Sequence, residues 1–112
     1  MQIVPNLDLT FHALSDGTRR AMIGALDQGR ECNAGELGRM FKSAQPTISK
    51  HLKVLEQAGL VERRIVGRSH RFRLRPEPLG EAERWIERHH QFWKGAVGQL
   101  ERMLAEAPHD PY

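Results

Sequence analysis

The sequence predicts a mainly α-helical domain with one small β-hairpin, arranged as a winged helix-turn-helix. Two observations support this fold class. Apolar residues recur every three or four positions through most of the 112 residues, which is typical of amphipathic helices. Between residues 60 and 75 this spacing gives way to the alternation of β-strands. A chain of this length holds one modest core. We therefore expect a single domain that comprises first helices (7–30), a helix-turn-helix (33–59), a wing (60–75), a dimerisation helix (79–105) and a tail (106–112).

The first thirty residues predict two short helices after a loose segment at 1–6. The first helix is indicated by apolar residues at i, i+4 and i+7, namely Leu7, Phe11 and Leu14. Ser15 or Asp16 is placed to cap a second helix, because a short polar side chain accepts a hydrogen bond from an amide in the first turn. We expect that helix to bury Met22, Ile23 and Leu26, and to close at Gly29.

A helix-turn-helix is predicted next. Asn33 followed by Glu36 has the form of a capping box and starts a short third helix. The fourth helix is expected to begin after an N-cap at Ser43 and to end at Gly59, which accepts the left-handed conformation of a C′ residue. Its buried stripe is Ile48, Leu52 and Leu55. Its other face is short, polar and cationic, which suits the phosphates and base edges of a DNA major groove.

The segment from Leu60 to Arg75 predicts a β-hairpin. Residues 60–66 are rich in β-branched side chains, and residues 71–75 alternate strictly. A four-residue turn, Gly67-Arg68-Ser69-His70, separates them. Because a two-stranded hairpin is not stable alone, it must lean on the helices as a wing. Arg68 and Arg71 would then reach backbone phosphate or an adjacent minor groove.

A long last helix is predicted after two prolines, at 79–105. Its apolar and semi-polar positions follow a heptad seam: Ala82, Ile86, His89, Trp93, Ala96, Leu100 and Met103. Further apolar residues widen this strip beyond what the edge of one small domain needs. A symmetric dimer would bury it; the alternative is that it packs on the core of its own chain. The predicted dimer interface consists of Phe11, Ile86, His89, Trp93, Ala96 and Leu100.

The charge of the chain is unevenly distributed. The net charge is +3, but residues 42–75 hold nine Lys or Arg against two Glu, a local charge of +7. Such a concentration is typical of nucleic-acid binders, although a merely solvated charged face is the alternative. With one cysteine, Cys32, the chain forms no internal disulfide. The sequence has no run of apolar residues of bilayer length and no signal peptide, so we expect a cytoplasmic protein.

No catalytic constellation is recognisable. The sequence contains no Gly-rich phosphate loop, no nucleophile with a supporting His and acid, and no carboxylate pair in a plausible cleft. We therefore expect neither enzymatic activity nor a cofactor.

Three segments resemble the ArsR/SmtB family of winged-helix repressors. Phe11-His-Ala-Leu-Ser-Asp-Gly-Thr-Arg-Arg20 is similar to the family opening FxALSDPTRRxIL, with Gly17 in place of Pro. Gln45-Pro-Thr-Ile-Ser-Lys-His-Leu-Lys-Val-Leu55, followed by Ala58-Gly-Leu-Val61, is similar to the recognition segment QPTVSKHLKVLREAGLV. Gly67-Arg68 and Arg71-Phe-Arg-Leu74 resemble the wing pattern GRxxxYxL. The resemblance implies a homodimer that represses a palindromic operator and releases it on a signal.

The resemblance does not imply which signal is sensed. Soft-metal sensors of the family carry a Cys-x-Cys where this chain has Asn33 and Gly35, and Cys32 has no thiol partner nearby. A second family site needs a histidine eleven residues after His89, where Leu100 stands. The chain instead resembles a metal-free subgroup with tryptophans in the last helix. We expect no metal site, and a small-molecule inducer stays unidentified.

The predicted DNA contacts are Lys42, Gln45, Pro46, Thr47, Ser49, Lys50, His51, Lys53, Arg68 and Arg71. Among them, Lys42, Lys53, Arg68 and Arg71 are assigned to phosphates. Two alternatives stay open: a metal- or redox-responsive repressor with an unrecognised sensing site, and a winged-helix module that binds proteins.

Overall fold

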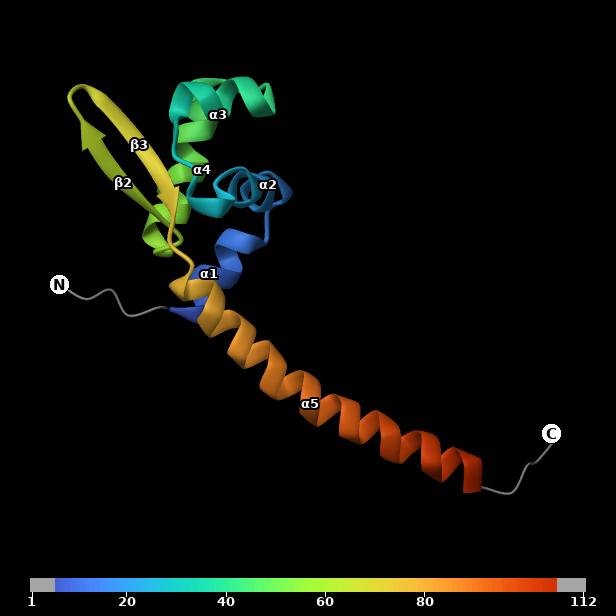
Figure 1. The fold of residues 1–112 in the computed structure, drawn as a ribbon. Helices are drawn as coiled ribbons and strands as arrows, with labels where there is room; N and C mark the ends of the chain where they lie inside the picture. Colours follow the sequence, from blue (N-terminus) through green and yellow to red (C-terminus); the bar gives the residue numbers. More distant parts are fainter. Residues whose placement is uncertain (1–5, 107–112) are drawn as a thin grey trace. The chain divides into compact units, whose positions relative to one another are not determined.

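The computed structural model describes residues 6–106, in which short helices lie to one side of a small antiparallel sheet and a long helix follows (Figure 1). In order, the elements are α1 (Leu7–Leu14), α2 (Gly17–Ala25), the 3-10 turn η1 (Asp27–Gly29), β1 (Cys32–Asn33), α3 (Ala34–Phe41), α4 (Gln45–Gln57), β2 (Val61–Val66), β3 (Ser69–Leu74) and α5 (Glu77–Glu106). This architecture confirms the predicted fold class. The described residues form two compact units, one up to Ala82 and one from Glu83 onward. None of their helices is long and apolar enough to cross a membrane.

Side-chain caps define the starts of the first helices. The Asn6 side chain accepts a hydrogen bond from the Leu9 amide, so Asn6 caps α1 and the prediction that it is loose was wrong. Asp16 caps α2 by accepting from the Arg19 amide at 3.0 Å. α2 ends at Ala25, earlier than the predicted closure at Gly29, because η1 follows before the chain turns into β1.

α3 begins with the predicted capping box. The Asn33 side chain accepts from the Glu36 amide at 2.8 Å, and the Glu36 carboxylate accepts from the Asn33 amide. α3 ends at Phe41, and its C-cap Lys42 has a left-handed backbone with φ of 50°. A Cβ on Gly38 would lie 3.3 Å from the Ser43 carbonyl oxygen. The turn between the two helices is therefore tight and leaves little room for a larger residue at position 38.

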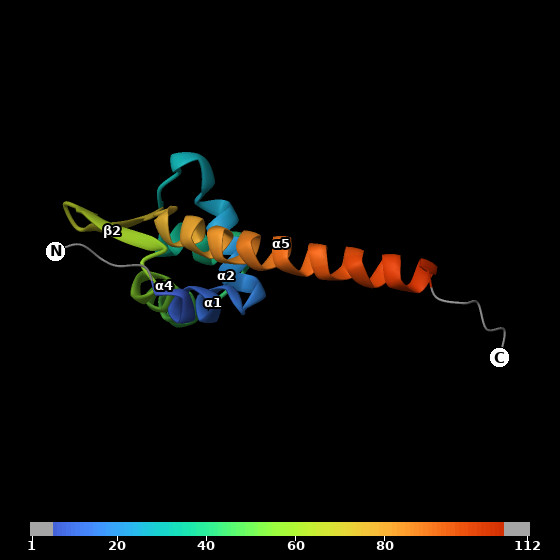
Figure 2. The ribbon, with the colours of Figure 1, turned by 90° about the horizontal axis from the view of Figure 1, so that it is seen from below.

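α4 is the central helix of the first unit and contacts α1, α2, α3 and β2. Figure 2 shows α1 and α2 beside α4. Its N-cap is Ala44, which provides no side-chain cap. The predicted cap at Ser43 was wrong, because the Ser43 hydroxyl donates to the Phe41 carbonyl oxygen at 3.2 Å. The other end is as predicted: Gly59 has φ of 73°, and the Gly59 and Leu60 amides bond back to Glu56 and Leu55 in a Schellman motif.

The sheet has three strands in the order β1-β3-β2, so the predicted two-stranded hairpin was incomplete. Val66 pairs with Ser69, which leaves a loop of only Gly67 and Arg68 where a four-residue turn was expected. The missed strand β1 places Cys32 opposite Phe72. Both side chains are buried in a core that also contains Ala13, Met22, Ile23, Leu26, Leu37, Ile48, Leu52, Leu55, Ala58, Leu60 and Val61.

α5 begins at Glu77, two residues before the predicted start. Pro78 lies in its first turn, where a missing N–H breaks no helical hydrogen bond. The helix continues to Glu106, so this residue of the predicted tail is helical, and the remaining tail lies outside the described residues. Pro78 and Ala82 are buried within the first unit.

Candidate nucleic-acid interface

The outward face of α4 is polar and exposed. Pro46, Ser49, Lys50 and Lys53 recur at i, i+3, i+4 and i+7, opposite the buried stripe of Ile48, Leu52 and Leu55. Gln45 and Thr47 are exposed at the N-terminal end of the same helix. Packing therefore fixes one side of α4 and leaves the other side, with its hydroxyls, amide and ammonium groups, available to a partner.

Three lysines of this region have no partner of their own. Lys42 lies in the turn, and Lys50 and Lys53 lie on α4; all three are exposed and form no side-chain hydrogen bond or ion pair within residues 6–106. Their positive charges are not neutralised internally, so they remain available for phosphate groups.

The wing arginines, in contrast, are mostly paired with carboxylates. Arg63 donates to Glu56 at 2.7 Å and lies over the Phe72 ring. Arg64 forms a bidentate pair with Glu31, at 2.9 and 2.7 Å. Glu62 binds Arg73 and, at 3.6 Å, Arg75, which also lies 3.7 Å from Glu77. Arg68, in the exposed loop at the tip, has no hydrogen bond or ion pair among the described side chains.

Arg71 lies in a different environment from Arg68. It is half-buried and stands directly opposite Arg64, so the two side chains share one face of the sheet. The Arg64 hydrogen bond lowers the pKa of the Glu31 carboxyl, and the charges of Arg73 and Arg71 lower that pKa further. Arg71 thus interacts electrostatically with a carboxylate of its own chain, whereas Arg68 does not.

His51 is anchored within the chain. Its side chain is 17% exposed, and its Nδ1 lies 3.4 Å from the Arg19 guanidinium and 4.0 Å from the Asp16 carboxylate. Arg19 also donates to the Ala13 and His12 carbonyl oxygens at 2.8 and 3.1 Å. His51 therefore connects α4 to the end of α1, besides any contact that it makes with DNA.

Asp16 belongs to the same cluster. The Arg19 amide hydrogen bond lowers the pKa of its carboxyl, and the charges of Arg19 and His51 act in the same direction. The carboxylate is thus held in its charged form at the start of α2, where negative charge also interacts favourably with the helix dipole.

The residues at the family's metal positions have structural roles here. Asn33 caps α3, and Gly35 has no side chain. Cys32 is 1% exposed, and burial, followed by the charge of Glu36, raises the pKa of its thiol. Among residues 6–106, no group of three or more His, Cys, Asp or Glu side chains could hold a metal ion.

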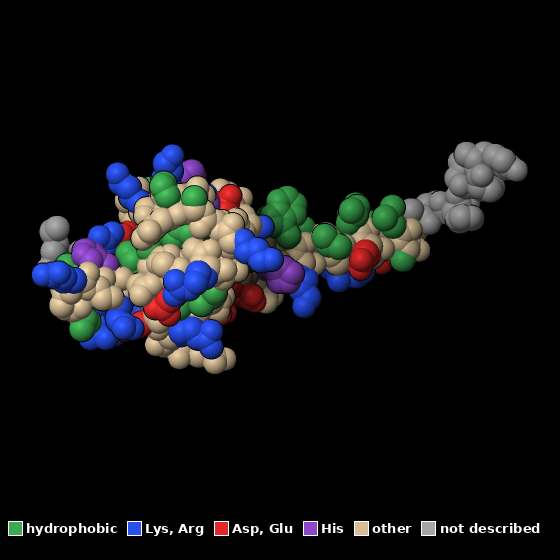
Figure 3. Space-filling model, turned by 90° about the horizontal axis from the view of Figure 1, so that it is seen from above, with side chains coloured by type: hydrophobic (Ala, Val, Ile, Leu, Met, Phe, Trp, Pro, Cys, Tyr) green, Lys and Arg blue, Asp and Glu red, His purple; other side chains and the backbone are tan. Residues whose placement is uncertain are grey.

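The second unit is a helix with an exposed apolar strip. Figure 3 shows green hydrophobic side chains along one edge of this helix, and blue Lys and Arg side chains around the wing at the left of the picture. His89 is exposed, stacks on Trp85 with ring centroids 4.2 Å apart and bonds through Nδ1 to the Trp85 carbonyl oxygen. The large exposed residues of the strip are Trp85, Ile86, Phe92, Trp93, Val97, Leu100, Met103 and Leu104. Of the other predicted interface residues, Phe11 and Ala96 are half-buried.

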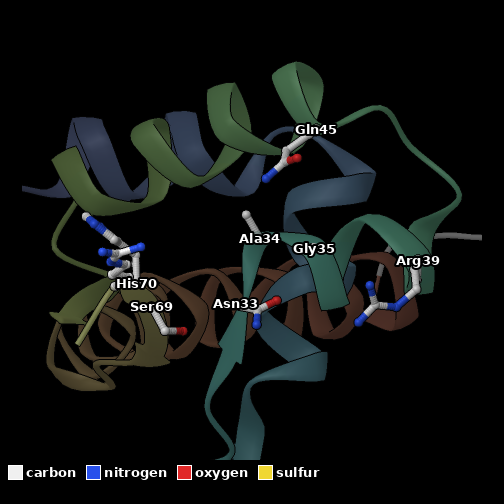
Figure 4. Close-up of a pocket in the computed structure, with 8 residues that line it drawn as sticks. Asn33, Ala34, Gly35, Arg39, Gln45, Ser69 and His70 are labelled. Atoms are coloured by element: carbon white, nitrogen blue, oxygen red, sulfur yellow. The ribbon is translucent and has the colours of Figure 1, made fainter. Parts of the chain in front are cut away.

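Two polar residues near the wing were not singled out from the sequence. Arg39 is exposed on α3, and His70 is exposed on β3 beside Arg63. Both line a cavity with Gln45 and Arg68, although they are far apart in the sequence (Figure 4). The only local signal is the glycine at position 35, one helical turn before Arg39, which leaves space over that turn.

Comparisons with known proteins agree with this arrangement. A family model described as a helix-turn-helix domain matches residues 14–64. The HTH-type transcriptional regulator Rv2034 of Mycobacterium tuberculosis is 38% identical over 90 residues, which cover 80% of each chain. The transcriptional repressor SdpR of Bacillus subtilis is 32% identical over 76 residues, 68% of this chain and 83% of SdpR. The crystal structure of the ArsR family transcriptional regulator RHA00566 matches with a TM-score of 0.71 and 32% identity, covering 84% of this chain and 97% of that one.

Proposed function

This chain belongs to the ArsR family of winged helix-turn-helix transcriptional regulators, and from this membership we propose that it acts as a homodimeric repressor that binds a palindromic operator. The family is regulatory and DNA-binding rather than enzymatic. SdpR, the relative from Bacillus subtilis, is named a transcriptional repressor, and repression requires only that the bound protein blocks access to a promoter.

The proposed DNA interface rests on one observation: some Lys and Arg side chains of the first unit are paired with carboxylates, and others are not. Arg63, Arg64, Arg73 and Arg75 are paired with carboxylates, whereas Lys42, Lys50, Lys53 and Arg68 are exposed and unpaired within the described residues. In this proposal the unpaired groups bind phosphates, while Gln45, Thr47 and Ser49 reach base edges from the same helix. Pro46 packs against the sugar-phosphate backbone of the DNA, and Arg71 makes a secondary phosphate contact. His51 donates its Nε2–H to the DNA.

The apolar strip of α5 supports the homodimer. Residues such as Trp93 and Leu100 are 62% and 54% exposed in the single chain. A second copy would remove them from water through a self-complementary, twofold interface. A twofold dimer presents two α4 helices to two half-sites about one helical turn apart, which is why a palindromic operator follows from the dimer.

Two substitutions at phosphate positions test the interface. We expect Lys50→Ala and Arg68→Ala each to flatten the log–log dependence of DNA affinity on salt by about 0.9, the share of one phosphate. Fluorescence anisotropy with a duplex selected from a random library measures this slope. Arg73→Ala is the matched control, since its charge is already paired with Glu62. Equal slopes for all four proteins would refute the assignment.

The base-reading role of Gln45 needs a different measurement. We expect Gln45→Ala to change the ranking of operator variants at one position, with weaker discrimination there of roughly 1–3 kcal/mol. Repeating the duplex selection with this variant reports the change. A uniform loss of affinity on all sequences would instead place Gln45 outside the base contacts.

The sensing alternative has weaker support in the structure. A thiolate sensor requires a cysteine with a lowered pKa and access to solvent. Burial raises the pKa of Cys32, and its side chain is enclosed by the core.

A further inference from the structure

An open cavity of about 500 Å³ lies between the start of α3, the start of α4 and the wing. Its lining residues are Asn33, Ala34, Gly35, Arg39, Gln45, Arg68, Ser69 and His70. In the close-up, Arg39 and His70 stand on opposite sides, with Ala34 between them and Gln45 above (Figure 4). The lining contains two guanidinium groups and no carboxylate, so its electrostatic character is positive.

Arg39 and Gly35, one helical turn apart on α3, both line the cavity. A Cβ on Gly35 would lie 3.7 Å from Nη1 of Arg39, an ordinary van der Waals contact, so the guanidinium lies beside the first turn of α3. Arg39 and Arg68 form no hydrogen bond or ion pair within residues 6–106. Both are therefore available for an anion.

His70 contacts Arg63 through one of its two ring nitrogens. Its Nδ1 lies 3.2 Å from Nη1 of Arg63, which can only donate, so Nδ1 accepts and the proton lies on Nε2. Arg63 is itself fixed by Glu56 of α4 and by the Phe72 ring. This chain of contacts leaves Nε2–H of His70 as a donor for a group in the cavity.

We infer that this cavity is a phosphate-binding site, in which Arg39, Arg68 and His70 hold one phosphate group and Gln45 borders it. Guanidinium groups match phosphate oxygens in geometry and charge, and a third donor adds direction. The phosphate has two possible sources: a backbone phosphodiester of the operator, or the phosphate of a small molecule that competes with it. The first source rests on the proposed function; the second does not.

The DNA arm of the test compares arginine variants. Arg39→Gln is expected to flatten the log–log salt slope of duplex binding by about 0.9, and Arg39→Lys to keep the wild-type slope. Arg30→Gln is the control, because Arg30 is exposed and does not line the cavity. His70→Ala is expected to weaken binding by about tenfold or more through loss of one charge-assisted hydrogen bond.

The second arm uses inorganic phosphate and no DNA. NMR spectra of the free protein are recorded as phosphate is added, with the amides of Gly35 and Ser69 as reporters. Shifts that saturate in the wild type and disappear in Arg39→Gln assign the site to free phosphate. A changed salt slope without such shifts assigns it to the DNA backbone.

The inference is overturned if Arg39→Gln keeps the wild-type salt slope and phosphate produces no shifts that depend on Arg39. This outcome differs from failure of the proposed function, in which the wild-type protein binds no duplex even at low salt. In that case the phosphate titration alone tests whether the cavity binds phosphate. Shifts that are lost in Arg39→Gln support the phosphate site, and the absence of such shifts refutes it.

Discussion

Helix α4 of the first unit buries its large apolar side chains, whereas α5 in the second unit exposes them. In the first unit, up to Ala82, the large apolar side chains of α4 are buried, with Leu52 only 2% exposed. In the second unit, from Glu83 onward, Phe92, Trp93 and Leu104 of α5 are each more than 60% exposed. The first unit contains the buried core, and the second unit is a helix whose large apolar side chains are exposed.

This contrast separates two sources of free energy. Burial within the first unit contributes to its folding, and each side chain there is matched by neighbours in the same chain. Within residues 6–106, every buried side-chain nitrogen or oxygen has a hydrogen-bond partner. The strip of the second unit gains most of its burial only when another surface covers it, so its contribution depends on protein concentration.

The largest expected effect comes from a substitution in the exposed strip. If a second copy covers this strip, Trp93→Ala removes a large aromatic anchor twice per dimer. Loss of about 2 kcal/mol per copy would weaken dimerisation about a thousandfold. Sedimentation equilibrium over a range of concentrations measures the dimer dissociation constant.

Lys94→Ala, one residue along the same helix, is the control for truncation on α5. We expect its dissociation constant to stay within a few fold of the wild type, because exposed polar side chains contribute little at the rim of an interface. If the wild type and Trp93→Ala had similar dimer dissociation constants, the apolar strip of α5 would have no role in assembly. The distinction between a unit that folds and a unit that dimerises would then be wrong.

A core substitution is expected to have the next largest effect, on folding rather than assembly. Leu52→Ala in the first unit should lower the free energy of unfolding by roughly 2–5 kcal/mol. Ile86→Ala in the strip should change it by at most about 0.5 kcal/mol. Both are measured by urea unfolding in the Trp93→Ala background, where assembly no longer contributes. A loss of comparable size in the two variants would show that α5 has a core of its own.

Much of the first unit was predictable because its signals are local. The capping box of Asn33 and Glu36, the Asp16 cap and the end of α4 at Gly59 each depend on residues within a few positions of one another. The periodicity of α4 also identified its buried stripe, because one helix face must contact the core.

The wrong or missed predictions concern residues whose partners lie in another element of the fold. Ser43 was expected to cap α4, but its hydroxyl donates to a carbonyl oxygen at the end of α3. β1 was missed because two residues give no alternation, and only their pairing with Phe72 and Arg71 makes them a strand. Likewise, sequence alone could not show which arginines of the wing are paired, since Glu31 and Arg64 are 33 residues apart.

The smallest expected effect concerns the charges that fix α2 to α4. The pKa of the Asp16 carboxyl is lowered by the Arg19 amide and by the charges of Arg19 and His51. A lowered native pKa means that this stabilisation is complete above the unfolded pKa of about 3.9 and is lost as the pH falls through the lower native value.

Asp16→Asn keeps a good N-cap and removes this titration. We therefore expect the free energy of unfolding to fall less steeply with acid in Asp16→Asn than in the wild type, between about pH 5 and pH 2. Urea unfolding at several pH values measures this slope. Asp27→Asn is the control, since Asp27 forms no hydrogen bond or ion pair among the described residues. If Asp16→Asn and the wild type lose stability in parallel, the cluster around His51 holds α4 by packing alone, and charge plays no part in fixing the helix that faces DNA.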